Sequence, residues 1–226
     1  IELKNTYYPN LDDYDFNKRL LELKEISIHK IDDYPDILTI KDFENKANEL
    51  CGGFDKSSFQ YLMAHYLSYR TPYKSLMLYY GVGVGKTCSA IATASNSFEK
   101  DGYTILWVTR HTLKPDIWKN MFGSVCSSVI KRKILNGDNI PKEVASNPLK
   151  YLSDSWVMPI SYKQFTNMLA EKNDIFRLMK KRNGADDPLR KTLVIIDEVH
   201  KLYSTDLPAA ERPNLKLLKE KIKNSY

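Results

Sequence analysis

The sequence predicts an α/β fold in which helices flank a parallel β-sheet, with a mostly helical extension at the N-terminus. Two observations carry this prediction. Runs of aliphatic and β-branched residues, typical of strands buried on both faces, alternate along the chain with helical patterns. Glycine-rich or acidic segments follow directly after two of these apolar runs, at the edge where parallel sheets present their ligand-binding groups.

The N-terminal extension is predicted to span residues 1–56, and the α/β domain residues 57–226. The extension is rich in Tyr, Asp and Lys, and Phe16–Glu25 has the amphipathic spacing of a helix. Turns are expected at Tyr7–Asn10 and Asp32–Pro35, where Pro, Asn and Asp cluster. We expect this extension to dock either on the domain or on a partner.

A glycine-rich loop follows the first strand of the domain. Apolar residues at helical spacing predict a helix over Ser57–Tyr69, and the apolar stretch Ser75–Tyr80 predicts a strand. This strand runs into Gly81-Val-Gly-Val-Gly-Lys-Thr87, a sequence typical of a nucleoside triphosphate cradle. The glycines allow backbone N–H groups to turn inward around a β-phosphate. The predicted nucleotide-binding residues here are Gly81, Gly83, Val84, Gly85, Lys86, Thr87 and Cys88.

Two side chains of this loop have predicted roles in ATP chemistry. Lys86 can neutralise the β- and γ-phosphates, and the hydroxyl of Thr87 can bind Mg²⁺ at the start of a helix. Tyr80 stands where the strict motif has a glycine, so the match is to the shorter Gly-x-Gly-Lys-Thr form.

A second apolar run, Thr192–Ile196, predicts a buried strand and ends in two carboxylates, Asp197 and Glu198. The carboxyl ends of parallel strands meet at one edge, so these carboxylates are expected beside the glycine-rich loop. Asp197 is suited to hold Mg²⁺, and Glu198 to orient and deprotonate the attacking water. The alternative interpretation is that both carboxylates simply end a core strand in solvent.

The other elements complete the alternation. Thr104–Thr109 and Ser155–Ile160 are predicted strands, each followed by a helix that begins near Pro115 or Tyr162. Residues 129–154 and 171–191 are expected to be charged connections, and Leu215–Lys223 has the pattern of a lysine-rich helix. Parallel strands with right-handed crossovers follow from this order.

Composition restricts the class of protein. The chain has 226 residues, no apolar run long enough for a membrane span and no signal-peptide pattern. Its three cysteines, Cys51, Cys88 and Cys126, are widely spaced, which favours a reducing, intracellular environment over a zinc site. Residues 1–56 carry 13 acidic and 8 basic side chains, a net of −5, which leaves 15 and 26, a net of +11, for 57–226. This excess of basic side chains favours nucleic acid as a partner. The alternative interpretation is a lysine-rich surface that faces only solvent.

Three motifs together carry a family resemblance. With Gly83-Val-Gly-Lys-Thr87, Val108-Thr-Arg-His-Thr-Leu113 and Asp197-Glu-Val-His200, the chain resembles the first lobe of superfamily 2 helicases and translocases, a RecA-like phosphate-loop ATPase fold. The Asp-Glu-x-His form separates it from other phosphate-loop ATPases. The resemblance implies ATP and Mg²⁺ as cofactors, and a coupling role for His200 between the nucleotide site and a second lobe or nucleic acid.

The resemblance also implies further contacts. Gln60 lies where the family places a glutamine that recognises adenine. Thr109, Arg110, Ser161 and Tyr162 lie where it contacts the backbone of DNA or RNA. The spacing from Phe59 to Thr87 is similar to that of members from large nucleocytoplasmic DNA viruses, among them poxviral transcription proteins. A viral transcription role is therefore expected, with an RNA polymerase or a transcription factor subunit as partner and the virion or host cytoplasm as location.

A second motor lobe does not follow Asp197-Glu-Val-His200, and the chain begins with Ile1. We therefore expect a fragment that binds ATP weakly and hydrolyses it poorly, because the second lobe supplies arginines that stabilise the γ-phosphate charge. Two other functions are compatible with the sequence. One is a phosphate-loop ATPase that acts on protein, and the other is a non-catalytic interaction module whose acidic extension recruits a partner.

Overall fold

The centre of the protein is a three-stranded parallel sheet. The computed structural model describes residues 7–28, 39–42, 58–79, 86–121, 155–184, 187–204 and 206–222. Within them the sheet has the order β2-β1-β3 and consists of β1 (Thr104–Thr109), β2 (Ile160–Ser161) and β3 (Thr192–Ile196). Thr104 lies opposite Thr192, and Thr109 opposite Ser161. The predicted α/β fold with a parallel sheet is confirmed.

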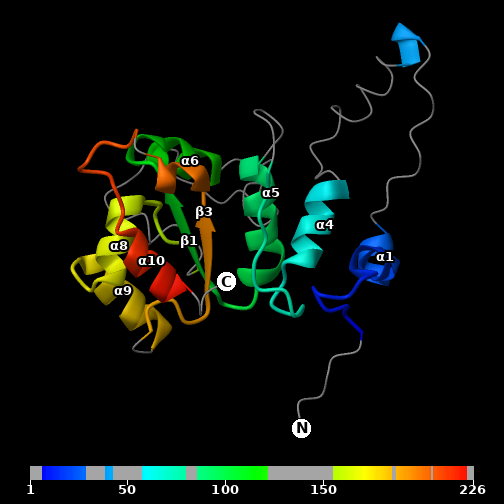
Figure 1. Ribbon diagram of the computed structural model, residues 1–226, viewed down its shortest axis with the longest axis horizontal. Helices are drawn as coiled ribbons and strands as arrows, with labels where there is room; N and C mark the ends of the chain where they lie inside the picture. The colour runs from blue at the N-terminus through cyan, green and yellow to red at the C-terminus, as the bar shows by residue number, and fades with distance from the viewer. Residues whose placement is uncertain are drawn as a thin grey trace, which may run out of the picture.

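Helices cover both faces of this sheet, as Figure 1 shows. One face carries α5 (Lys86–Thr93), which continues into the π-helical turn η1 (Ala94–Phe98), and α4 (Ser58–Tyr66) packs on α5. The other face carries α8 (Tyr162–Leu169), α9 (Asp174–Asn183) and α10 (Leu215–Lys221). The 3₁₀ turn η2 (His111–Leu113) and α6 (Lys114–Met121) follow β1, and the 3₁₀ turn η4 (Val199–Tyr203) follows β3. None of the helices in these described ranges has the length and apolar character of a membrane span.

Strand β1 divides the core into two halves by simple alternation. Ile105 and Trp107 pack with the side chains of α5 and η1, whereas Leu106 and Val108 pack with those of α8 and α9. Successive side chains of a strand point to opposite faces, so a strand with all six residues buried must have a hydrophobic layer on each side. The continuous apolar run in the sequence is explained by this double burial.

Side-chain caps fix the helices that follow β2. Ser161 accepts a hydrogen bond from the Gln164 amide, and Gln164 returns one to the Ser161 amide, which makes a capping box at the start of α8. Helix α9 begins at an Asn173 cap and ends at Gly184 in the left-handed conformation. The prediction of a charged connection over residues 171–191 is therefore wrong over residues 174–183, which form α9.

The strand predicted at Ser75–Tyr80 is also wrong over its described part. Residues 75–79 have no regular secondary structure, and no described strand pairs with them. Met77 and Tyr79 are 73% and 91% exposed. A strand is stable when neighbouring strands satisfy its backbone groups, and an apolar sequence alone does not supply that partner.

The described part of the N-terminal extension docks on the domain. Its helix pattern is divided into α1 (Phe16–Glu22) and α2 (Lys24–Ser27), because the buried Leu23 between them is extended. Tyr8 and Phe16 make edge-to-face contacts with Tyr73, whose hydroxyl donates to the Pro9 carbonyl at 2.9 Å. The predicted division at residues 56 and 57 stays a prediction.

Candidate nucleotide site

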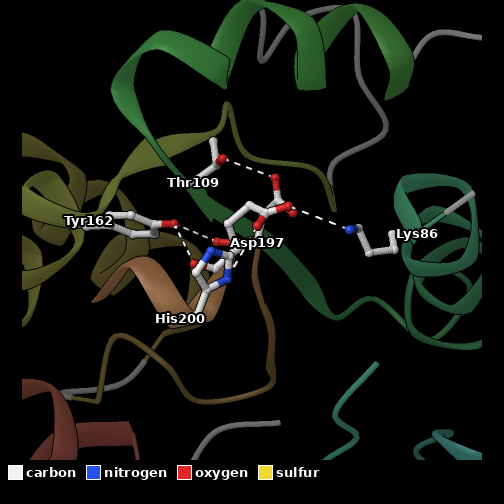
Figure 2. A network of polar contacts seen from close by, with 6 residues as sticks. Lys86, Thr109, Tyr162, Asp197 and His200 are labelled. Atoms are coloured by element: carbon white, nitrogen blue, oxygen red, sulfur yellow. Dashed lines mark hydrogen bonds and ion pairs between the residues drawn. The ribbon is translucent and has the colours of Figure 1, made fainter. Parts of the chain in front are cut away.

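Charged side chains from two separate elements meet at the carboxyl end of β3. Lys86 is the first residue of α5, and Asp197 and Glu198 follow the last residue of β3. The Nζ atom of Lys86 lies 3.7 Å from Oε1 of Glu198, and both side chains are 33% exposed. In Figure 2 Lys86 reaches the acidic cluster from one side and Tyr162 from the other. Lys86, at the end of the glycine-rich loop, therefore lies beside the carboxylates that follow β3, as predicted. Residues 80–85, with Gly81, Gly83, Val84 and Gly85, lie outside the described residues.

The carboxylate of Asp197 is held at the end of the central strand. Its Oδ2 accepts a hydrogen bond of 3.2 Å from the hydroxyl of Thr109, and its amide donates to the Val108 carbonyl at 2.9 Å. Burial raises the pKa of Asp197 above its ordinary value, and the neighbouring Glu198 carboxylate raises it further. The bond from Thr109 opposes this shift because it favours the ionised form. Asp197 is thus a partly buried carboxyl whose ionised form a cation would stabilise.

Glu198 has an unusual backbone. Its φ of 50° and ψ of 46° lie in the left-handed region, which residues other than glycine rarely adopt. This backbone conformation costs such a residue about 1–3 kcal/mol. This conformation ends β3 and begins η4. The carboxylate then lies between Lys86 and His200, whose Nδ1 is 3.4 Å from Oε2 of Glu198. The His200 side chain is 64% exposed, so it can face a further ligand or lobe.

Tyr162 approaches the same cluster from the opposite face of the sheet. Its hydroxyl donates to the Asp197 carbonyl at 2.6 Å, and the Glu198 carbonyl is 3.3 Å away. The side chain is 1% exposed. Burial raises the pKa of Tyr162 above its ordinary value, with added contributions from Asp197 and Glu198. The hydroxyl is therefore protonated and acts as a hydrogen-bond donor.

The four residues predicted to contact nucleic acid lie in two different environments. The side chains of Thr109, Ser161 and Tyr162 are buried, and their hydroxyls bond to Asp197, to the start of α8 and to the strand end. Arg110 is partly exposed, and its buried Nε has no hydrogen-bond partner among the described residues. A contact of the other three with nucleic acid stays a prediction, and in this conformation their hydroxyls serve the interior of the protein.

The remaining predicted nucleotide-binding residues lie on α4 and α5. Gln60 is in the first turns of α4, the helix that packs on α5. Thr87 and Cys88 are partly buried in the first turn of α5. The sulfur of Cys88 is in a disulfide, which differs from the reduced cysteines expected from their wide spacing; the other two cysteines lie outside the described residues.

The oxygen donors at the site suit Mg²⁺. Among the described residues no group of three or more His, Cys, Asp or Glu side chains could hold a metal ion alone. A nucleotide-bound Mg²⁺ needs only one or two protein oxygens, because phosphates and water complete its shell. Thr87 and Asp197 supply a hydroxyl and a partly buried carboxylate, and burial raises the pKa of Asp197, so a bound cation would favour its ionised form. These residues fit the predicted ion.

Sequence reasoning overlooked the internal roles of two hydroxyls and one amide. Thr109 supports Asp197, Tyr162 supports the backbone at Glu198, and Gln164 caps α8 while it accepts a bond of 3.1 Å from Lys114. The sequence held one signal for them, the Ser-x-x-Gln capping pattern at Ser161. The pairing of Thr109 with Asp197 depends on the register of β1 and β3, which no local pattern contains.

Comparisons with known proteins agree with this geometry. The family model "Type III restriction enzyme, res subunit" matches residues 40–226. "Putative ATP-dependent RNA helicase L377" of Acanthamoeba polyphaga mimivirus is 34% identical over 95 residues, which cover 41% of this chain and 8% of that protein. "Putative ATP-dependent RNA helicase R563" of the same virus is 29% identical over 152 residues, which cover 64% of this chain and 24% of that protein. The chain thus spans less than a quarter of either relative, and no solved structure matches it significantly.

Proposed function

Since this chain belongs to the type III restriction enzyme res subunit family, which holds first lobes of superfamily 2 helicases, we propose that it is the ATP-binding lobe of a nucleic-acid motor. An ATP hydrolase of the helicase type is the activity that this family has in common. The finer proposal concerns the site. Lys86, Asp197 and Glu198 carry the reaction, and movement along or remodelling of nucleic acid is what the reaction drives.

The observation that carries this proposal is the ion pair between Lys86 and Glu198 beside Asp197. A lysine at the start of a helix and two carboxylates at a strand end are the protein groups that phosphoryl transfer to water requires. Without nucleotide, the Lys86 ammonium and the Glu198 carboxylate neutralise each other. When phosphates bind, they compete for Lys86, and Glu198 is released to accept a proton.

Each side chain then has one step. Glu198 orients a water molecule and takes its proton while the water oxygen attacks the γ-phosphorus and the bond to the β–γ bridging oxygen breaks. Lys86 compensates the negative charge on the phosphates. Thr87 and Asp197 would hold Mg²⁺, which neutralises phosphate charge when bound. Gln60 is the proposed contact with adenine. The proposed phosphate cradle consists of the backbone of Gly81, Gly83, Val84 and Gly85, together with that of Cys88.

The proposed track is nucleic acid, and RNA is the first candidate. The two mimivirus relatives are named as RNA helicases, and residues 57–226 carry the net charge of +11. Arg110 and His200 are the proposed contacts with exposed surface, at the edge that carries Asp197. We further propose that the lobe works in a viral transcription setting, in the virion or host cytoplasm, and needs a second lobe for full turnover.

A hydrolysis assay in the intact protein tests the proposal. ATP turnover is measured without nucleic acid and with single- and double-stranded RNA and DNA, at two salt concentrations. We expect stimulation by RNA that weakens at the higher salt, because phosphate contacts release counterions. Turnover that no nucleic acid changes would instead indicate a motor that acts on protein.

A further inference from the structure

We infer that Tyr162 is a positioning residue for Glu198, which holds the backbone of the proposed base in its left-handed conformation from beneath the sheet edge. The inference rests on the proposed function only for its catalytic consequence. The structural part of the inference, that Tyr162 fixes the backbone conformation of Glu198, does not depend on the proposed function. The Tyr162 hydroxyl bonds to main-chain carbonyls of the site and makes no hydrogen bond to the carboxylates of Asp197 and Glu198.

The hydroxyl of Tyr162 lies on the two carbonyls that flank the strained residue. The Asp197 carbonyl precedes the Glu198 nitrogen, and the Glu198 carbonyl follows its Cα, so the pair defines the φ and ψ angles of Glu198. The Tyr162 hydroxyl lies 2.6 Å from the Asp197 carbonyl oxygen and 3.3 Å from the Glu198 carbonyl oxygen. It therefore favours the backbone conformation in which both carbonyls point toward the Tyr162 side chain. Figure 2 shows the two dashed lines that converge on this oxygen.

The position of the Tyr162 ring is itself fixed by several elements. Ser161, the preceding residue, pairs with Thr109 in the sheet and caps α8 through its side chain. The ring is buried in the α8 half of the core with Phe165 and Met168. A side chain held by sheet, cap and core can impose its geometry on a neighbour, whereas a flexible one would follow that neighbour.

The left-handed backbone also directs the Glu198 carboxylate. It begins η4, and the Lys201 amide donates to the Glu198 carbonyl at 2.8 Å, so the Tyr162 hydroxyl supports the carbonyl that starts this turn. From this conformation the carboxylate reaches both Lys86 and His200. Without the hydroxyl, Glu198 is free to relax toward the extended backbone that its chemistry prefers, and the carboxylate moves away from the water it must deprotonate.

A matched pair of hydroxyl deletions tests the inference. Tyr162→Phe removes the hydroxyl and keeps the ring. Tyr73→Phe is the control, because Tyr73 is also buried and its hydroxyl also donates to a main-chain carbonyl oxygen, here that of Pro9, which is not part of the site. In the intact protein we expect Tyr162→Phe to lower kcat about 10- to 100-fold with KM for ATP unchanged, as a small displacement of a catalytic group does. Tyr73→Phe should change neither, while both variants lose a similar few degrees of Tm.

A second readout does not depend on catalysis. In the present chain, hydrogen exchange of the Lys201 amide should be faster in Tyr162→Phe than in the wild type, and unchanged in Tyr73→Phe. Equal exchange in all three proteins, or a kcat of Tyr162→Phe equal to that of the wild type, would overturn the inference. A loss of kcat of the same size in Tyr73→Phe would assign the effect to general destabilisation and overturn it too. If the wild type itself does not hydrolyse ATP, the proposed function fails, and the exchange measurement still decides the role of Tyr162.

Discussion

The Lys86 ammonium lies 3.7 Å from the Glu198 carboxylate, although the two residues come from opposite halves of the chain. Helix α5 contributes the cation from its first residue, and the end of β3 contributes the anion. Both side chains keep a third of their surface exposed, so neither is locked in the interior. An ion pair that is this accessible can be exchanged for a phosphate, and this exchange links binding of ATP to release of the base.

Replacement of Lys86 should weaken both ATP binding and ATP turnover. In Lys86→Met the phosphates lose their cation, and we expect kcat to fall about 10²- to 10³-fold, the effect of one lost electrostatic contact in a phosphoryl- or acyl-transfer site. ATP affinity should fall as well, which fluorescence titration with a labelled ATP analogue measures. Lys100→Met, an exposed lysine after η1, is the control. Equal affinity and turnover in both variants would remove Lys86 from the site.

Asp197→Asn should make the protein more stable and less active. Burial raises the pKa of Asp197, so the folded state binds its proton more tightly than the unfolded state does. This group therefore favours folding at low pH, and its contribution is lost as the pH rises through the folded pKa. The asparagine carries no charge to bury and can still accept the bond from Thr109. We expect a higher Tm for Asp197→Asn at pH 7 and no ATP turnover.

Two controls accompany that measurement. The difference in Tm should disappear below the ordinary Asp pKa of about 3.9, where the wild-type carboxyl is neutral in both states. Addition of Mg²⁺ with a nucleotide analogue should reverse the order at pH 7, because only the wild-type carboxylate gains a ligand. A Tm for Asp197→Asn below that of the wild type at pH 7 without Mg²⁺ would contradict the account.

Thr109→Val tests the hydrogen bond that supports Asp197. The bond from the Thr109 hydroxyl lowers the pKa of Asp197, so its removal should raise that pKa and move the acid limb of the activity profile to higher pH. Stability should fall by about 1 kcal/mol for the lost bond. Thr93→Val removes a buried hydroxyl that bonds within α5 and should leave the pH profile in place. An unshifted acid limb in Thr109→Val would show that Asp197 does not set it.

Arg110→Ala tests the proposed track at its partly exposed arginine. Arg110 is partly exposed at the edge that carries Asp197, and its buried Nε has no partner in the described part of the chain. We expect weaker RNA binding across sequences and a slope of log K against log salt that is smaller by about one contact. ATP hydrolysis without RNA should stay at the wild-type level. An unchanged slope would remove Arg110 from the proposed interface.

Strands β1 and β3 could be predicted from the sequence, whereas the strand predicted at Ser155–Ile160 is in the structure the two-residue β2, Ile160–Ser161. Six consecutive buried residues give β1 an apolar run without alternation, and the same holds for the beginning of β3. Ser161 and Gln164 mark the start of α8 through a local capping box. These apolar runs and the capping box each involve only a few neighbouring residues, so the elements that they mark can be predicted without knowledge of the fold.

The internal contacts of the site could not be predicted in this way. Thr109 ends β1, and Tyr162 directly follows β2 as the first residue of α8. Family resemblance assigned both to nucleic acid, whereas in the structure the Thr109 hydroxyl bonds to the Asp197 carboxylate and the Tyr162 hydroxyl to the carbonyls of Asp197 and Glu198. The stretch Ser75–Tyr80 has a strand's composition, yet pairing decides whether a strand forms. The sequence did contain capping residues for α9, Asn173 at its start and Gly184 at its end. The segment was nevertheless interpreted as a connection because it is highly charged.

The most direct test of the account is a comparison of ATP binding and ATP turnover in Glu198→Gln and the wild type, in the intact protein with RNA present. The glutamine cannot accept the proton of the attacking water, and it also releases Lys86 from the ion pair. We expect turnover to fall by at least about 10²-fold while ATP binds as tightly as before or more tightly. Turnover that survives the substitution, or a loss of binding equal to the loss of turnover, would contradict the assignment of Glu198 as the base.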